Sequence, residues 1–205
     1  CDALAKAIAA GQADVGACPV GGAPVAEKIG GIMGVAGGAA EKKVAFVKCA
    51  GTCDKTKVQY NYYGVDDCQK VSVVPGAGEK ACAYGCMGYG SCVKACAFDA
   101  IHVVDGVAVV DKEKCVACGK CVASCPNHLI ELVPYKAEHL VRCNSHDKGK
   151  DVKAACAAGC IGCTLCTKQC EYGAIHMENN LAVIDYEKCT NCGKCAEKCP
   201  VKVIQ

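Results

Sequence analysis

The sequence predicts an α+β protein in which one cysteine-rich module occurs twice, behind a small and mainly helical segment. Cysteine supplies 23 of the 205 residues, a share at which cysteines dictate the scaffold. Large hydrophobic side chains are scarce, with no tryptophan and two phenylalanines. Two cysteine runs near the C-terminus have the spacing C-x2-C-x2-C-x3-C, and residues 174–200 fall on residues 100–126 without a gap, which indicates a duplication.

The C-x2-C-x2-C-x3-C run is typical of thiolates that bind a [4Fe-4S] cube, and its fourth cysteine ligates the other of two clusters. We therefore predict two tandem bacterial 2[4Fe-4S] ferredoxin-like modules preceded by a small mainly helical cluster-binding segment. In the second module, residues 159–205, one cluster has Cys160, Cys163, Cys166 and Cys199, and its partner has Cys189, Cys192, Cys195 and Cys170. Tetrahedral zinc is the alternative, but it needs four ligands and has no use for two interleaved quartets.

The first module, residues 80–135, has a looser leading run of C-x3-C-x5-C-x3-C. We assign one of its clusters to Cys82, Cys86, Cys92 and Cys125, and the other to Cys115, Cys118, Cys121 and Cys96. Proline follows the last cysteine of each module but not Cys96 or Cys170, so the turn there departs from the bacterial ferredoxin pattern while the thiol remains.

Each module also contains two short strands joined by a two-residue turn, D-G in the first copy and N-N in the second, which predicts a β-hairpin. We expect the hairpins to cover the clusters on one side and helices that begin at the fourth cysteines to cover the other. His102 and His176 occupy equivalent strand positions. Because the ligand sets are complete without them, we interpret these histidines as solvent-facing residues.

Residues 1–40 form the N-terminal segment, with helices predicted over residues 2–10 and residues 24–33. This segment contains Cys1 and Cys18, and two thiols do not hold a four-iron cube. Two buried free cysteines are one interpretation. We favour a partial [4Fe-4S] site, a fifth cluster whose remaining ligands lie upstream of Cys1.

Residues 41–79 form a connecting segment rich in cysteine and tyrosine, with a short strand predicted over residues 44–48. Its thiols are Cys49, Cys53 and Cys68, and no fourth partner can be assigned to them. A further cluster, a zinc site with one borrowed ligand, and packed free thiols all remain open here.

Residues 136–158 link the two modules and contain Cys143 and Cys156 together with His139 and His146. A Cys/His zinc site is conceivable from this composition, but the spacing lacks the compact C-x2-C pattern. We therefore predict a short helix over residues 151–157 and interpret the two cysteines as spare or packed thiols.

Composition and charge argue against several other classes of protein. The odd number of cysteines, their metal-like spacing and the expected lack of a signal peptide disfavour a secreted disulfide framework and indicate a reducing, cytoplasmic compartment. A net charge of +2 gives no basic patch for nucleic acid. The sequence has no run of 18 apolar residues, and no G-x-G-x-x-G follows a predicted strand, so we expect no bound NAD.

The order of these segments resembles the B subunit of Rnf-type ferredoxin:NAD oxidoreductase complexes, in the long version found in anaerobic bacteria. The resemblance covers nearly the whole chain. It rests on C-D-A-L-A-K-A-I-A-A-G-Q-A-D-V-G-A-C-P at residues 1–19, Y-N-Y-Y-G-V-D-D-C at residues 60–68, V-R-C-N-S-H-D-K-G-K-D-V-K-A-A-C at residues 141–156, and the two ferredoxin modules. Ferredoxin runs alone occur in many redox proteins, so the order of the segments is the specific signal.

The resemblance implies an electron-transfer subunit of an ion-translocating ferredoxin:NAD oxidoreductase, at the cytoplasmic face of the cell membrane. Such a subunit accepts electrons from soluble reduced ferredoxin and relays them to the other subunits of a membrane complex. It implies four [4Fe-4S] clusters in the modules, a fifth completed upstream of Cys1, an N-terminal membrane anchor outside this sequence, and no catalytic side chains. A freely diffusing polyferredoxin and a zinc-stapled interaction protein are the alternatives.

Overall fold

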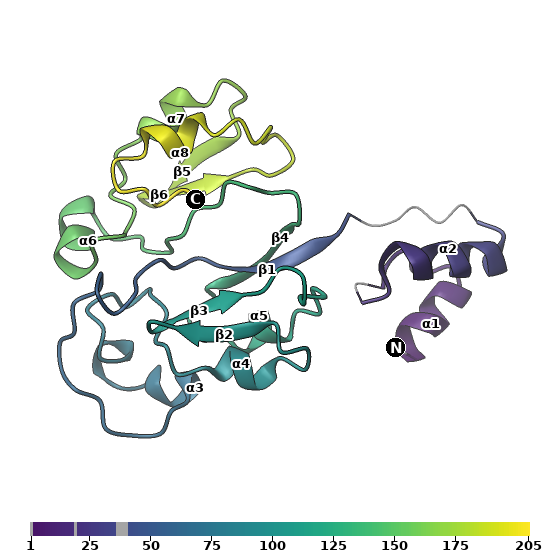
Figure 1. The fold of residues 1–205 in the computed structure, drawn as a ribbon, viewed down its shortest axis with the longest axis horizontal. Coiled ribbons are helices and arrows are strands. Elements are labelled where there is room, and N and C mark those ends of the chain that lie inside the picture. The colour runs from purple at the N-terminus through teal and green to yellow at the C-terminus, as the bar shows by residue number, and fades with distance from the viewer. Residues whose placement is uncertain (1, 19, 36–40) are drawn as a thin grey trace.

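The computed structural model describes residues 2–18, 20–35 and 41–205 (Figure 1). Two small α+β halves contain most of the chain, and the antiparallel pair β1 and β4 lies between them in this view. The helices are α1 (Asp2–Ala9), α2 (Gly22–Met33), α3 (Cys68–Val71), the 3-10 helix η1 (Pro75–Ala77), α4 (Ser91–Ala95), α5 (Lys120–Ser124), α6 (Gly149–Ala155), α7 (Leu165–Gln169) and α8 (Lys194–Lys198). The strands are β1 (Lys43–Val47), β2 (Ile101–Val104), β3 (Val107–Val110), β4 (Ile130–Pro134), β5 (Ile175–Glu178) and β6 (Leu181–Ile184).

The two halves have the same order of elements. The first half contains α4, β2, β3 and α5, and the second contains α7, β5, β6 and α8, each 74 positions later. Both hairpins are antiparallel, with Val104 opposite Val107 and Glu178 opposite Leu181. The turn residues D-G and N-N all have positive φ, as a tight two-residue turn of this kind requires. The hairpins predicted from the sequence are therefore confirmed.

The fourth cysteine of each run ends a short helix, whereas we expected it to begin one. Cys125 follows α5 and Cys199 follows α8, and both have extended backbone, with ψ of 111° and 115°. Pro126 and Pro200 come next, and proline disfavours the helical conformation in the residue before it. That expectation was wrong: the helices contain the third cysteine of each run and stop at the fourth.

The strand predicted in the connecting segment is present as β1, and its partner is β4. The two pair antiparallel from Lys43 opposite Pro134 to Val47 opposite Ile130. Val44 and Val133 face each other and are each 1% exposed. This pairing attaches the connecting segment to the chain that follows the cysteines of the first half.

Two further backbone pairings tie the linker between the halves to distant parts of the chain. Leu140 and Gln205 exchange both backbone hydrogen bonds, at 2.8 and 3.1 Å, which joins the linker to the C-terminus. Residues 55–57 pair with residues 155–157, through Lys57 N–H to Ala155 O at 3.0 Å and Ala157 N–H to Lys55 O at 2.8 Å. The connecting segment therefore lies beside the end of α6, just before the second half begins.

The buried core is small and rich in thiols. The largest fully buried side chains are Ile101, Leu129, Val44, Val71, Val107, Val133 and Val203. In the second half, the buried cluster also contains the side chains of Cys143, Cys160, Cys166, Cys195 and Cys199. Cysteine thus occupies positions that a protein of this size would normally give to larger hydrophobic residues.

Helices α1 and α2 lie apart from the two halves in Figure 1. In α1, Lys6 pairs with Asp2 at 2.9 Å, and α2 ends at Gly34, whose φ is 67°. Within the described part of the chain, the structure contains no helix of the length and hydropathy needed to cross a membrane.

Candidate iron-sulfur sites

Two cavities are each lined by a complete quartet of thiols, and each quartet combines two cysteine runs. In the first half, one cavity is lined by Cys96, Cys115, Cys118 and Cys121. In the second half, the equivalent cavity is lined by Cys170, Cys189, Cys192 and Cys195. The last cysteine of the leading run thus lies beside the first three of the following run, as the crossed pairing requires.

The remaining quartet of the second half lies in its buried core. Cys160, Cys166 and Cys199 are all buried in one cluster. Burial raises the pKa of the Cys166 thiol to about 11, and the neighbouring sulfurs of Cys160 and Cys163 contribute. The four thiols that the spacing assigns to this cluster are therefore close neighbours in the fold.

Backbone N–H groups point at several of these sulfurs. The thiols of Cys125 and Cys199 each accept from the backbone N–H four residues later, that of Leu129 and that of Val203, both at 3.4 Å. Cys170 accepts from Ala174 at 3.3 Å in the same way. Donors of this kind favour the charged thiolate. When a cluster is bound, hydrogen bonds to sulfur are among the factors that set its reduction potential. The residues present therefore fit an iron-sulfur cluster.

The structure departs from the sequence analysis at one quartet of the first half. Cys86, Cys92 and Cys125 line a common cavity as expected, but the fourth thiol on its wall is that of Cys68, from the N-terminus of α3. Burial raises the pKa of Cys92 to about 12, and the sulfurs of Cys86, Cys68 and Cys125 contribute. Asp67 caps α3 by accepting from Gln69 N–H at 2.9 Å, which places Cys68 at the start of that helix.

Cys82, which we had assigned to that quartet, lines a different cavity. Its wall includes Cys49, Cys143 and Cys156, and therefore residues from both sides of the first half. Burial raises the pKa of the Cys82 thiol to about 11, and the sulfurs of the same three cysteines contribute. Cys49, Cys143 and Cys156 are thus site candidates that spacing alone did not assign.

The sequence itself indicates this arrangement when the 74-residue repeat is followed further toward the N-terminus. With the same shift of 74 positions, C-A-Y-G-C at residues 82–86 falls on C-A-A-G-C at residues 156–160. Cys82 is then equivalent to Cys156, and Cys86 to Cys160. Tyr89 takes the position that Cys163 has in the second half. The first half therefore lacks one thiol of the regular run, and Cys68 is the thiol that the fold brings there.

Of the two N-terminal cysteines, the structure describes Cys18. Cys18 is partly buried, and its sulfur accepts from Gly21 N–H at 3.4 Å. Cys1 lies outside the described residues.

The two strand histidines are exposed, as predicted. The side chain of His102 is 49% exposed and lies 3.6 Å from Asp99, and that of His176 is 51% exposed and lies 2.7 Å from Glu178. Neither lines the cysteine cavities described above.

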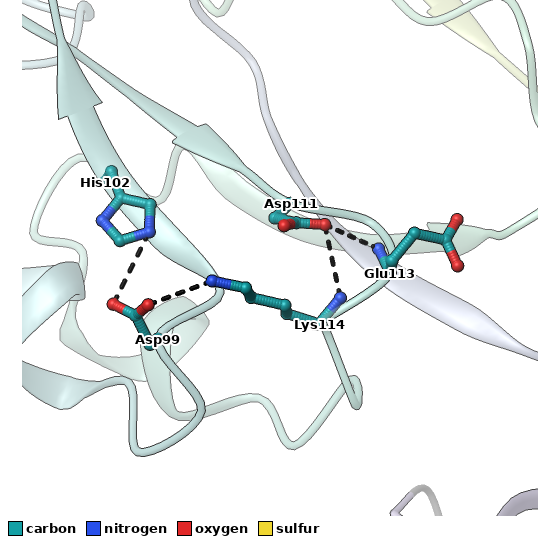
Figure 2. A network of polar contacts seen from close by, with 5 residues as sticks. All are labelled: Asp99, His102, Asp111, Glu113 and Lys114. Carbon is teal, nitrogen blue, oxygen red and sulfur yellow. Dashed lines mark hydrogen bonds and ion pairs between the residues drawn. The ribbon is translucent and has the colours of Figure 1, made fainter.

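Figure 2 shows the polar contacts that shape the loop before Cys115. The carboxylate of Asp111 accepts from the backbone N–H of Glu113 at 2.9 Å and of Lys114 at 3.3 Å. The Lys114 ammonium group hydrogen bonds to Asp99 at 3.1 Å, and this bond, with the charges of Lys114 and His102, holds the pKa of Asp99 below its usual value. Asp185 repeats the first contact in the second half, with Glu187 N–H at 3.0 Å.

We expect Asp111→Ala to lower the free energy of unfolding by about 1 kcal/mol, the usual cost of losing a side chain that caps backbone N–H groups. Asp111→Asn should retain most of the stability, because its amide oxygen also accepts. Denaturant unfolding of the iron-loaded protein under anaerobic conditions measures both. Equal losses in the two variants would show that the negative charge matters and that the acceptor does not.

Comparison with known families agrees with these sites. Residues 159–203 match the 4Fe-4S dicluster domain family, and residues 108–131 match the 4Fe-4S binding domain family. The fold and its thiol cavities therefore belong to an iron-sulfur protein with ferredoxin-type domains.

The whole chain is also similar to the B subunits of three redox complexes. It is 48% identical to the B subunit of the Na(+)-translocating ferredoxin:NAD(+) oxidoreductase complex of Acetobacterium woodii and spans 61% of that protein. It is 46% identical to the B subunit of the ion-translocating oxidoreductase complex of Methanosarcina acetivorans, spanning 78% of it. It is 39% identical to the B subunit of the proton-translocating ferredoxin:NAD(+) oxidoreductase complex of Clostridium ljungdahlii, spanning 73% of it. The chain belongs to this family of Rnf-type B subunits, which confirms the resemblance found in the sequence.

Proposed function

We propose that this chain relays electrons through [4Fe-4S] clusters as a subunit of an ion-translocating ferredoxin:NAD oxidoreductase. The observation that carries the proposal is the crossed arrangement of thiols, in which Cys96 and Cys170 each share a cavity with the run that follows them. This arrangement supports two clusters side by side within each small half. When bound, such clusters take up and release single electrons at potentials that hydrogen bonds to sulfur and solvent access determine.

We propose four ligand sets for the two halves, with Cys68 in the place first given to Cys82. In the first half they are Cys68, Cys86, Cys92 and Cys125, and Cys96, Cys115, Cys118 and Cys121. In the second half they are Cys160, Cys163, Cys166 and Cys199, and Cys170, Cys189, Cys192 and Cys195. The cavities, the buried thiol cluster and the backbone N–H groups directed at sulfur support these assignments.

The proposed donor is soluble reduced ferredoxin, and the proposed acceptors are the other subunits of the membrane complex. Two of the named relatives are subunits of ferredoxin:NAD(+) oxidoreductase complexes. The middle thiols Cys118, Cys163 and Cys192 are exposed, so three of the proposed clusters lie near surfaces that a soluble donor can approach. We place these surfaces at the cytoplasmic face of the membrane, with the N-terminal segment nearest the bilayer.

We also propose that Cys1 and Cys18 belong to a further [4Fe-4S] site, with ligands that this sequence does not include. The support is that the similarity to the named B subunits covers the whole chain, residues 1–19 included. Electrons would then run from the two halves toward the N-terminal segment.

Reduced ferredoxin is expected to reduce the clusters of the anaerobically purified protein, which bleaches their visible absorption. A version that lacks residues 1–40 should still be reduced by ferredoxin, but within the membrane complex it should fail to pass electrons on. Loss of ferredoxin oxidation in the shortened protein would place electron uptake at the N-terminal segment and reverse the proposed direction. If the intact protein reduces no membrane partner and does not copurify with one, a freely diffusing polyferredoxin is the better description.

A further inference from the structure

One thiol-lined cavity lies at the junction of the two halves and is not among the four proposed module sites. Its thiols come from four separate parts of the chain: the connecting segment (Cys49), the start of the first half (Cys82), the linker (Cys143) and the end of α6 (Cys156). Cys86 also lines it, on the side of the neighbouring site.

The four sulfurs surround a common space. Cys156 Sγ and Cys49 Sγ lie 3.3 and 3.6 Å from a single point, the position that a Cβ on Gly51 would occupy. Cys82 and Cys143 line the same cavity as these two thiols. The thiols of this cavity therefore lie around one common space.

The sulfurs are hydrogen bonded in the way that the ligands of the module sites are. Cys49 accepts from the backbone N–H of Gly51 and of Cys86, both at 3.4 Å. Cys143 accepts from the N–H of Ser145 at 3.4 Å and of Cys160 at 3.3 Å. The Thr56 hydroxyl lies 3.6 Å from Cys156 Sγ. These donors favour thiolates, the form in which cysteine binds metal.

Two cationic side chains on the cavity wall point to a bound anionic group. Lys80 is 8% exposed, and its ammonium group donates to the carbonyls of Gly106, Cys86 and Gly51 at 2.6, 2.9 and 3.4 Å. Arg142 also lines the cavity; its Nη1 donates to Gln205 Oε1 at 3.1 Å, and its buried Nε has no hydrogen-bond partner among the described residues. A buried donor without an acceptor is costly, so an acceptor beside Arg142 Nε would stabilise the structure. A cube held by four thiolates carries net negative charge and has sulfides that accept hydrogen bonds.

We propose that Cys49, Cys82, Cys143 and Cys156 bind an additional [4Fe-4S] cluster at the junction of the two halves. The four thiols around one cavity, the N–H donors on sulfur, the buried Lys80 ammonium group and the unpaired Arg142 Nε all fit this group. Zinc held by four thiols is the alternative at this site, and metal analysis distinguishes the two.

The site also links the two halves in a symmetric way. Cys82 lies four residues before Cys86, and its repeat equivalent Cys156 lies four residues before Cys160. The backbone N–H of Cys86 donates to Cys49, and that of Cys160 donates to Cys143. Each half thus offers one proposed ligand of its own cluster directly beside a ligand of the junction site. One electron leaving a reduced cluster of one half would reduce the junction cluster, and the same electron would then reduce a cluster of the other half.

The test is an iron and sulfide analysis of the full chain purified without oxygen. The double variant Cys82→Ala/Cys156→Ala removes two ligands of the junction site alone. We expect it to lose about four iron and about four sulfide per chain, one cluster, while the EPR signals of the module clusters persist. The matched control is Cys53→Ala, because Cys53 is exposed and lines none of these cavities, and it should keep its full iron content.

An unchanged iron content in the double variant would overturn the proposal. So would a zinc content of about one per chain in the wild-type protein that is absent from the double variant. Arg142→Gln provides an independent readout if the double variant loses all its iron by misfolding. Removing a cation beside an anionic cluster makes that cluster harder to reduce, so one transition in an EPR redox titration should move to lower potential while the others stay. If no transition moves, the site is not occupied as proposed.

The role assigned to this cluster rests on the proposed electron relay, but its existence does not. Failure of ferredoxin to reduce the protein, with the iron loss of the double variant intact, would refute the relay and leave the site. If the double variant keeps its full iron content and ferredoxin reduces the protein normally, the junction site is refuted and the relay stands.

Discussion

Removing the iron from the anaerobically purified protein is expected to unfold both halves together. The described core contains few large hydrophobic side chains, and much of its buried surface consists of cysteine that is proposed to ligate iron. Metal binding to a site that does not exist in the unfolded chain is folding free energy, which for a structural zinc site is on the order of 10 kcal/mol. The net stability of a whole domain is only about 5–15 kcal/mol. Loss of several clusters should therefore exceed what the remaining contacts supply.

Far-UV circular dichroism and amide hydrogen exchange during chelation measure this effect. The expected result is the loss of signal from β2–β3 and β5–β6 in one transition, because β1, β4 and the linker connect the halves through backbone hydrogen bonds. A reductant must be present throughout, since free cysteines that form disulfides would hide the unfolding. Iron-free protein with native circular dichroism and slow exchange would contradict the prediction.

Substituting Cys68 with alanine should remove one cluster from the first half, about four iron per chain. Cys68 lines the cavity of Cys86, Cys92 and Cys125 although it lies before the first half in sequence. Tyr89 occupies the position that Cys163 has in the second half, so the loop of the first half supplies one thiol fewer. Tyr89 and Cys68 also pack into the same small hydrophobic cluster, with Tyr62 edge-on to the Tyr89 ring at 5.4 Å.

The double variant Cys68→Ala/Tyr89→Cys should recover the lost cluster. The new thiol at position 89 lies midway between Cys86 and Cys92, which gives the regular x2 spacing of the second half. The three thiols of this loop then complete the site together with Cys125. Tyr89→Cys alone is the matched control and should keep all its iron. The same substitution should not restore the iron lost from Cys82→Ala, which belongs to the junction site. Two outcomes would show that Cys82, and not Cys68, belongs to the first-half quartet. One is a full iron content in Cys68→Ala. The other is a loss of iron in Cys82→Ala that the added Tyr89→Cys substitution restores.

Local sequence was enough to predict the hairpins, the strand β1 and the grouping of the first three cysteines of each following run, which line one cavity. Tight turns depend on residues that tolerate positive φ, and D-G and N-N are read directly from the chain. The C-x2-C-x2-C-x3-C run likewise encodes its own geometry, because its first three thiols are near neighbours in sequence. The 74-residue repeat also contained the equivalence of Cys82 and Cys156, although the cysteine spacing of the first half pointed elsewhere.

Only the tertiary structure decided where the isolated cysteines lie. Cys49, Cys68 and Cys143 have no regular spacing, and their position depends on the pairing of β1 with β4, of residues 55–57 with 155–157, and of the linker with the C-terminus. These pairings join segments far apart in the chain, and the short strands involved carry no pattern that names their partner. The ends of the short helices were also misjudged, because the proline after the cysteine, and not the cysteine itself, determines where the helix stops. Spacing within a run is thus a property of the sequence, whereas the sharing of one cavity by four distant thiols is a property of the fold.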